Sequence, residues 1–194
     1  MQTDLFGAPK TRLPDGFTYF PEALPRALQD TLLTEISALP FKNFDFHGFE
    51  GKRRVVSFGW KYDFETKQAR QIGEIPPMLL PARDVAARLA GLEPNELKQA
   101  LVAEYGPGAP IGWHRDKMTF DVVVGISLLS ACTFRLRRKV HDKWKRVSII
   151  AEPGSVYVLS GQARNEWEHS IPPVEQLRYS ITFRQMRSRQ RLLG

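Results

Sequence analysis

The spacing of apolar residues divides the chain into a helical N-terminal part and a strand-rich remainder. Leucine and isoleucine recur at helical spacing from Leu24 to Leu39, and Pro40 ends the run. A second helix is predicted near 81–91, where apolar residues again share one face. Between the two helices, Gly48 and Gly51 indicate short strands joined by a loop.

From about residue 99 the apolar positions alternate with a period near two, which is typical of half-buried strands. The predicted strands are rich in Val, Ile, Phe and Tyr and span 99–105, 122–130, 132–138, 145–150, 154–160 and 178–186. Strands in this arrangement after a helical part predict an α+β, mainly β fold. We expect a β-sandwich or jelly roll with the N-terminal helices packed on one side.

Composition narrows the class of protein. The 194 residues include 28 Lys and Arg against 21 Asp and Glu, so the formal net charge is +7, which favours a polyanionic partner. The single cysteine excludes an internal disulfide framework and a cysteine-rich zinc module. No apolar run approaches the roughly 18–20 residues of a membrane span, and the N-terminus has no signal-peptide pattern. We expect one basic domain in the cytoplasm, or in the nucleus of a eukaryote, with no membrane contact and no obligate protein partner.

The histidines supply the first candidate chemistry. His114 and Asp116 form an H-x-D pair, and in a strand such a pair presents an imidazole and a carboxylate on one face. A third ligand, His169, follows 53 positions after Asp116. Two histidines and one carboxylate make the site that non-heme Fe(II) oxygenases use. His141 lies in a charged run that predicts a solvated hairpin, and His47 is given no metal role.

Two arginines extend this pattern. Arg178 and Arg184 are six residues apart, an even spacing that places both on one face of a strand. Each of these motifs alone can arise by chance. A chain in which an H-x-D pair is followed by a distal His and then by two Arg arises by chance far less often. A guanidinium is the right group to hold a dicarboxylate co-substrate against a metal.

With these residues in place, the chain resembles the AlkB family of Fe(II)/2-oxoglutarate-dependent nucleic-acid dealkylases over roughly residues 40–186. The matching stretches are Gly59-Trp60-Lys61-Tyr62, Tyr105-Gly106-Pro107-Gly108, Ile111-Gly112-Trp113-His114-Arg115-Asp116-Lys117, Gly125-Ile126-Ser127-Leu128, Trp167-x-His169 and Arg178-Tyr179-Ser180-Ile181-Thr182-Phe183-Arg184. The closing strand, with its T-F-R ending, is the most specific of them.

The resemblance implies a double-stranded β-helix with a lid at about 41–64 and a catalytic core at about 99–186. It implies Fe(II), 2-oxoglutarate and O2 as cofactors, with ascorbate as the reductant used in vitro. The implied iron ligands are His114, Asp116 and His169. The implied 2-oxoglutarate residues are Tyr105, Arg178, Ser180 and Arg184, the last at the metal-binding end of the co-substrate.

Three positions depart from the family's pattern. Ala103 stands at the first position of the family's N-x-Y, which removes one 2-oxoglutarate contact. Ser180 replaces an asparagine of the repair enzymes. Met118 stands where well-known repair members carry an acid that helps to read the flipped base. Met118 therefore bears on which substrate is recognised more than on the oxidation chemistry.

Two basic segments are candidates for binding nucleic acid, because such sites pair basic tracks with aromatic platforms. Alternate aromatic residues in a strand are equally typical of a core, and a charged hairpin is most often solvated surface. The predicted substrate contacts are Trp60, Tyr62, Arg53 and Arg54 in the lid, Met118, and Arg137 and Arg138 in the basic segment 135–146.

The implied function is oxidative removal of alkyl groups, such as methyl, from bases of single- or double-stranded DNA or RNA, with repair of alkylated DNA foremost. Two alternatives remain open. One keeps the oxygenase chemistry but acts on RNA, a protein side chain or a small molecule. The other is a nucleic-acid-binding module without catalysis.

Overall fold

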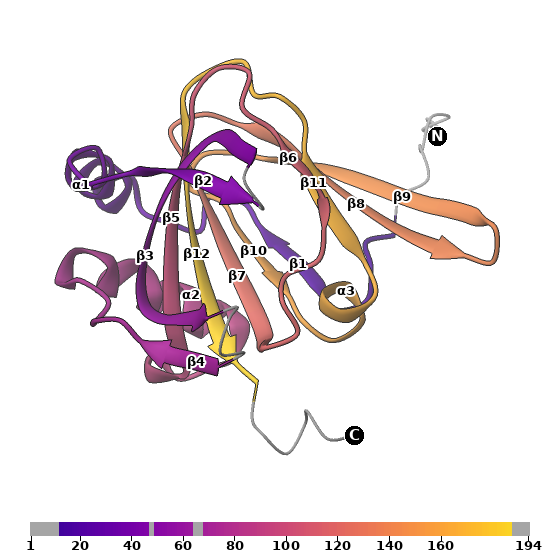
Figure 1. The fold of residues 1–194 in the computed structure, drawn as a ribbon, viewed down its shortest axis with the longest axis horizontal. Helices are drawn as coiled ribbons and strands as arrows, with labels where there is room; N and C mark the ends of the chain where they lie inside the picture. The colour runs from indigo at the N-terminus through magenta and orange to yellow at the C-terminus, as the bar shows by residue number, and fades with distance from the viewer. Residues whose placement is uncertain (1–11, 47–48, 64–67, 188–194) are drawn as a thin grey trace, which may run out of the picture.

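The computed structural model describes residues 12–46, 49–63 and 68–187, which form two antiparallel β-sheets and a few helices (Figure 1). The larger sheet contains β1 (Phe17–Phe20), β2 (Lys42–Phe46), β3 (Phe49–Asp63), β4 (Gln68–Gln71), β5 (Leu97–Tyr105), β7 (Phe120–Leu128), β10 (Val156–Leu159) and β12 (Arg178–Met186). The smaller sheet contains β6 (Ile111–His114), β8 (Cys132–Val140), β9 (Lys143–Ala151) and β11 (Glu168–Ile171). The helices are α1 (Arg26–Ile36), α2 (Leu80–Ala90) and α3 (Gly161–Asn165), with 3-10 turns at Pro77–Leu79 and Pro94–Glu96.

The strand order explains how distant segments meet. The larger sheet runs β1-β10-β7-β12-β5-β3-β2, with β4 beside β3, and the smaller sheet runs β6-β11-β8-β9. The C-terminal strand β12 therefore lies in the middle of the larger sheet, between β7 and β5. Its side chains alternate between the two faces of that sheet.

Each face of the larger sheet covers its own apolar core. On one face, α1 and α2 bury Leu32, Ile36 and Ala86 against residues such as Val102 and Ile181. On the other face, the smaller sheet closes a second core around Phe134, Trp167 and Leu159. The predicted jelly-roll arrangement, with helices on one side, is confirmed.

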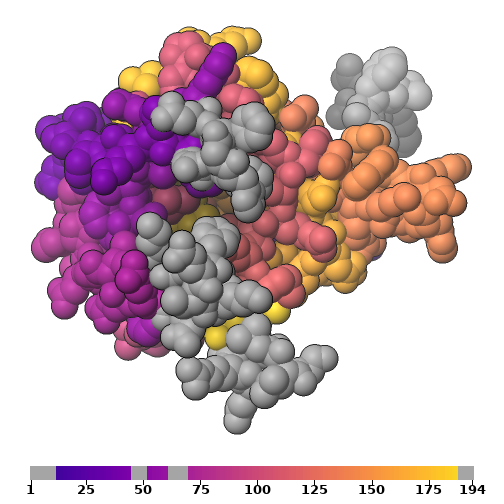
Figure 2. Space-filling view, viewed as in Figure 1, coloured from indigo at the N-terminus to yellow at the C-terminus, as the bar shows by residue number. Residues whose placement is uncertain are grey.

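Strands β8 and β9 extend away from this body as a long hairpin (Figure 2). The turn of the hairpin contains His141, which has a positive φ of 50° and is exposed. The prediction that His141 is a solvated hairpin residue is confirmed.

Several boundaries differ from those predicted. Strand β12 matches exactly as 178–186, whereas β7 begins and ends two residues before the predicted 122–130. The short strands β1, β6 and β11 are absent from the sequence prediction because four residues carry too little periodicity. No described helix is long and apolar enough to cross a membrane.

Candidate active site

A cavity opens between the two sheets and gathers most of the predicted chemistry. Its lining residues are Arg53, Leu101, Ala103, Tyr105, Ile111, His114, Asp116, Val123, Phe134, Tyr157, Leu159, His169, Ile171, Thr182 and Arg184. Tyr105 and Ala103 belong to this lining, and across β5 and β12 they pair with Arg178 and Ser180. Three of the four predicted cofactor-binding residues, Tyr105, Arg178 and Ser180, are therefore neighbours at the cavity wall. The fourth, Arg184, lies further along the same face of β12.

The two histidines come from neighbouring strands of the smaller sheet. His114 at the end of β6 pairs directly with His169 in β11, and their ring centroids are 4.3 Å apart. The Nδ1 atom of His114 is 2.9 Å from the carbonyl oxygen of Gly112. A proton on Nδ1 makes this contact a hydrogen bond and leaves Nε2 with a free lone pair.

Asp116 reaches the same place from a loop. The strand ends at His114, so the interpretation of H-x-D as a pair within one strand is wrong. The Oδ2 atom of Asp116 is nevertheless 3.6 Å from Nε2 of His169. Within the described ranges no three His, Cys, Asp or Glu side chains close around a common point. The three side chains are therefore neighbours that do not form a closed set of metal ligands in this structure.

Arg184 holds the Asp116 carboxylate. Its Nε and Nη2 atoms each lie 3.0 Å from Oδ1, and its Nη1 donates to Oε1 of Gln99 at 3.1 Å. Because Oδ1 is occupied by the guanidinium, Oδ2 is the oxygen that faces His169. Gln99 is a contributor that the sequence did not reveal.

The charges of these groups suit a metal. Burial and the neighbouring His114 lower the pKa of His169 to about 3, so the ring is neutral at physiological pH. Burial opposes ionisation of Asp116, but Arg184 and the two histidines outweigh it and hold the pKa of that carboxyl well below its usual range. Two imidazoles and one carboxylate are the donors that non-heme Fe(II) takes.

Next to Tyr105, which lines the cavity, Arg178 is fully buried at 0% exposure. Its Nη2 donates to Oγ of Ser127 at 3.2 Å, and the guanidinium lies 4.9 Å from the centre of the Tyr105 ring. The hydroxyl groups of Tyr105 and Ser180 are 3.4 Å apart. The Nε and Nη1 atoms of Arg178 have no hydrogen-bond partner among the described residues.

A buried guanidinium with two unused N–H groups is costly unless an anion completes it. A carboxylate matches the planar geometry of the guanidinium and accepts two hydrogen bonds at once. The observed residues therefore fit the distal carboxylate of 2-oxoglutarate, with Tyr105 and Ser180 as further hydroxyl donors.

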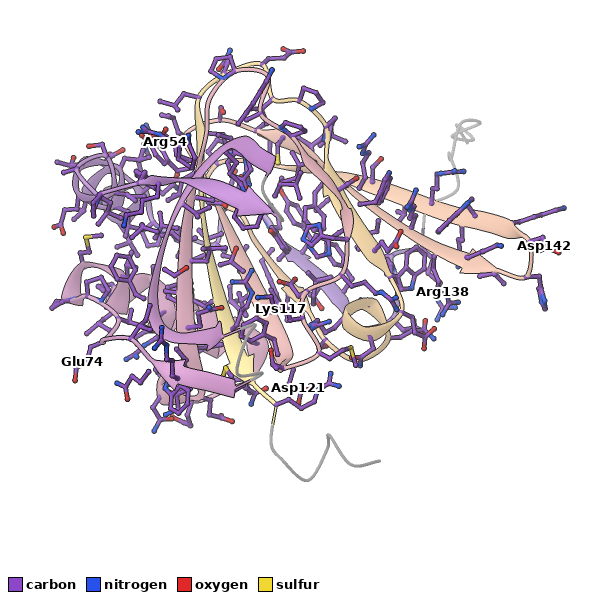
Figure 3. The ribbon with its side chains drawn as sticks, in the orientation of Figure 1. Arg54, Glu74, Lys117, Asp121, Arg138 and Asp142 are labelled. Atoms are coloured by element: carbon purple, nitrogen blue, oxygen red, sulfur yellow. The ribbon has the colours of Figure 1, made fainter. Side chains whose placement is uncertain are left out.

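The lid residues divide between the two faces of the sheet. Arg53 in β3 lines the cavity, whereas Arg54 lies on the opposite face and pairs with Glu104 at 2.6 Å. Figure 3 places Arg54 on the side of the sheet towards α1. The prediction of Arg54 as a substrate contact is therefore not supported, because the side chain of Arg53, its neighbour in β3, is the one that lines the cavity. Trp60 lies in the part of β3 that pairs with β4.

Met118 lies just beyond the Asp116 loop and is 55% exposed, so it is accessible beside the site. The side chain of Tyr62 and the whole of His47 lie outside the described residues.

Arg137 and Arg138 in the hairpin are already paired. Arg137 contacts Oε2 of Glu168 at 2.6 Å, and Arg138 contacts Oε2 of Glu166 at 2.5 Å. The guanidinium of Arg137 also lies 4.4 Å from the ring of Trp113 and 4.3 Å from that of Trp144. Figure 3 labels Arg138 on the hairpin, where it pairs with Lys145 two residues before β8 ends. Glu168 and Glu166, about 30 residues away in sequence, thus pair within the protein with both arginines that the sequence predicts as substrate contacts.

Tyr157 is a cavity residue that sequence analysis missed. It pairs with Gly125 across β10 and β7, and its ring covers Gly125 so closely that a methyl group there would collide with the ring. Burial raises the pKa of Tyr157, which keeps the phenol protonated and able to donate. The glycine of the matching stretch Gly125-Ile126-Ser127-Leu128 is the one sequence feature that could have indicated a bulky side chain packed here, because only glycine leaves room for the Tyr157 ring.

Residues 16–187 match a family model described as the 2OG-Fe(II) oxygenase superfamily. The chain belongs to this superfamily, which makes it a dioxygenase that uses Fe(II), 2-oxoglutarate and O2.

Curated relatives place it near the AlkB proteins. The chain is 27% identical over 145 residues to the Alkylated DNA repair protein ALKBH8 homolog of Arabidopsis thaliana, with 62% of this chain and 42% of that protein covered. It is 28% identical over 165 residues to the Alpha-ketoglutarate-dependent dioxygenase alkB homolog 7, mitochondrial, of Bos taurus, with 83% and 69% covered. It is 32% identical over 112 residues to the Alpha-ketoglutarate-dependent dioxygenase AlkB of Escherichia coli (strain K12), with 52% and 50% covered. The predicted resemblance to the AlkB family is confirmed, and the chain spans about half the length of the plant and bacterial relatives.

Solved structures agree on the fold. OsALKBH1 has a TM-score of 0.65 at 18% identity, and the match covers 90% of this chain and 100% of that one. A prolyl hydroxylase from Trichoplax adhaerens, in complex with a hypoxia inducible factor oxygen degradation domain peptide, has a TM-score of 0.66 at 14% identity, covering 92% and 87%. At these identities the likeness concerns the fold alone.

Proposed function

We propose that this dioxygenase removes alkyl groups oxidatively from nucleic-acid bases. The observation that carries the chemistry is the buried Arg178, whose unused N–H groups lie behind Tyr105, a residue that lines the same cavity as His114, Asp116 and His169. The relatives named for AlkB and for repair of alkylated DNA support a base as the substrate. The net charge of +7 favours a polyanionic substrate as well.

His114, Asp116 and His169 are the residues that we assign to Fe(II). The hydrogen bond to Gly112 fixes the tautomer of His114, and the ion pair with Arg184 fixes the orientation of Asp116. Such partners around a metal ligand orient it before the metal binds.

Arg178, Tyr105 and Ser180 are the residues that we assign to the distal carboxylate of 2-oxoglutarate. Arg184 lies beside Asp116 and is therefore assigned to the metal-binding end. Tyr157 lines the same cavity, and we assign its phenol to the donor role that Ala103 cannot provide.

When bound, the iron with 2-oxoglutarate and O2 oxidises a C–H bond of the substrate while 2-oxoglutarate is converted to succinate and CO2. The residues of this chain hold the reacting groups in register and keep water away, since Phe134, Leu159 and Ile171 line the cavity. A methyl group hydroxylated on nitrogen leaves as formaldehyde, and the nitrogen keeps the proton. One O2 and one 2-oxoglutarate are consumed for each methyl group.

The test is mass spectrometry of single-stranded DNA and RNA oligonucleotides that carry one methylated base. Each is incubated with the protein, Fe(II), 2-oxoglutarate and ascorbate, and a His114→Ala variant serves as the control. Loss of the methyl group with the wild-type protein alone supports the proposal. Succinate formation without loss of methyl from any DNA or RNA oligonucleotide contradicts it.

A further inference from the structure

Arg53 occupies a position at the cavity that the assigned chemistry does not use. It pairs with Tyr105 in β5, and Tyr105 pairs with Arg178 in β12, so the three side chains form a row on the cavity face. The Arg53 guanidinium lies 4.1 Å from the centre of the Phe44 ring. This cation–π contact orients the charge without neutralising it.

The charges around the cavity do not cancel. Asp116 is the only carboxylate among the described lining residues, and Arg184 pairs with it. Fe(II) and 2-oxoglutarate carry opposite charges of equal size. Arg178 and Arg53 are therefore left positive, because Arg53 forms no ion pair with any carboxylate whose side chain the structure describes.

The position after the Asp116 loop does not restore the balance. Met118 is exposed at 55% and offers a thioether where an acid could pair with a cation. A substrate base with a positive charge would thus meet a positive charge at Arg53 in a partly desolvated cavity, where repulsion is stronger than in water.

A guanidinium has five N–H donors and no acceptor. It can therefore donate a hydrogen bond to a carbonyl oxygen, but it offers no acceptor to an amino group. We propose, building on the proposed function, that the pocket selects alkylated bases that are neutral and present a carbonyl oxygen to Arg53, and that it disfavours cationic alkylated bases. Arg53, which the sequence predicts only as a substrate contact, then contacts the base itself.

Two bases form a matched pair for this proposal. In 3-methylthymine the ring is neutral and carries a carbonyl at position 4. In 3-methylcytosine the ring is cationic near neutral pH and carries an amino group there. The methyl group that leaves is on the same ring nitrogen in both.

The experiment is a competition in one tube between two single-stranded oligonucleotides of identical flanking sequence, one with each base, read by mass spectrometry. The wild-type protein is compared with Arg53→Gln, Arg53→Lys and Arg88→Gln, the last removing one exposed charge on α2. We expect the wild type to favour 3-methylthymine in kcat/KM. Arg53→Gln lowers this preference about tenfold, the worth of one charge-assisted hydrogen bond. Arg53→Lys keeps part of the preference, and Arg88→Gln leaves it unchanged.

A wild-type preference for 3-methylcytosine overturns the inference and leaves the proposed function intact. The same holds if a folded Arg53→Gln protein, checked by circular dichroism, shows the wild-type preference. Succinate formation without dealkylation of any DNA or RNA oligonucleotide overturns the proposed function itself and the inference with it. If the Arg53 variants do not fold, the inference is tested by the wild-type ratio of kcat/KM for 3-methylthymine to kcat/KM for 3-methylcytosine alone.

Discussion

Arg178 is the residue on which co-substrate binding depends most. Its guanidinium is fully buried, and two of its nitrogen atoms have no partner among the described residues. A charge in this position is stabilised when a carboxylate binds and is costly when none is present. The same group therefore provides affinity for 2-oxoglutarate and lowers the stability of the free protein.

The Arg178→Ala variant should bind 2-oxoglutarate at least about 30-fold more weakly, because a buried charge-assisted pair is lost. Isothermal titration of 2-oxoglutarate into the anaerobic Fe(II)-loaded protein measures this constant. Arg88→Gln, which changes the charge of an exposed helix, is the matched control. An unchanged dissociation constant in Arg178→Ala would move the carboxylate site elsewhere.

His169 provides a second test at this scale. Replacing it with alanine removes one of three assigned donors, and we expect the affinity for Fe(II) or its surrogate Co(II) to fall by more than about tenfold. The d–d absorption of Co(II) reports the coordination directly. The variant His141→Ala, at the tip of the hairpin, is the control. Equal Co(II) binding by wild type and His169→Ala would refute the assigned triad.

Gly125 shows how one residue makes space for another. A side chain at this position collides with the ring of Tyr157, so Gly125→Ala should lower the free energy of unfolding by about 1–3 kcal/mol through overpacking. Thermal or urea unfolding measures the loss. Gly106→Ala, where an added methyl meets nothing within 4 Å, should change stability far less. A Gly125→Ala protein as stable as the wild type would show that the Tyr157 ring moves freely.

Among the elements, the β8–β9 hairpin differs most from its predicted role. Arg137 and Arg138 face Glu168 and Glu166, so they stiffen the hairpin and are poor candidates for phosphate contacts. Lys143 and Arg146 in β9 are exposed. The charge that is available to a nucleic-acid backbone therefore lies on β9.

The double variant Lys143→Gln, Arg146→Gln should flatten the salt dependence of single-strand binding. Each lost phosphate contact lowers the slope of log K against log salt by about 0.7, so the slope should fall by about 1.4. Fluorescence anisotropy with a labelled oligonucleotide over a salt series gives the value, and Arg88→Gln should leave it unchanged. A slope equal to that of the wild type would make the hairpin plain solvated surface.

Sequence periodicity predicted the long elements well and the short ones poorly. The even spacing of Arg178 and Arg184 placed both correctly on the cavity face of β12, because nine residues of strand fix the alternation. The same reasoning failed for Asp116, since β6 ends at His114 and the chain turns into a loop. A strand of four residues gives no periodic signal that marks its end.

Neighbouring residues of one strand could not be separated by sequence either. Arg53 and Arg54 are chemically alike, and only the pairing of β3 with β5 decides that Arg53 points into the cavity. The partners of the hairpin arginines were equally hidden, because Glu168 approaches in β11 and Glu166 lies between α3 and β11, and the sequence did not reveal either element. Register between distant strands is set by the whole sheet and not by any local pattern.

At the scale of the whole molecule, the two sheets contribute different groups to the site. The helix-covered face of the larger sheet carries an apolar core, and the opposite face carries the guanidinium groups that meet the histidines of the smaller sheet. Each half of the site is thus built on strands that a separate packed core supports. This arrangement keeps the donors on the strands of the two sheets in register, and Asp116 joins them from the loop after β6.

The central claim is that oxidation of 2-oxoglutarate in this cavity is coupled to removal of an alkyl group from a base. The most direct measurement is the ratio of succinate formed to base dealkylated, both quantified by mass spectrometry in one reaction with a single-stranded oligonucleotide carrying 3-methylthymine. We expect a ratio close to one with the wild-type protein and neither product with Asp116→Ala. Succinate formed at the same rate with and without the methylated base, and no dealkylated base, would contradict the account.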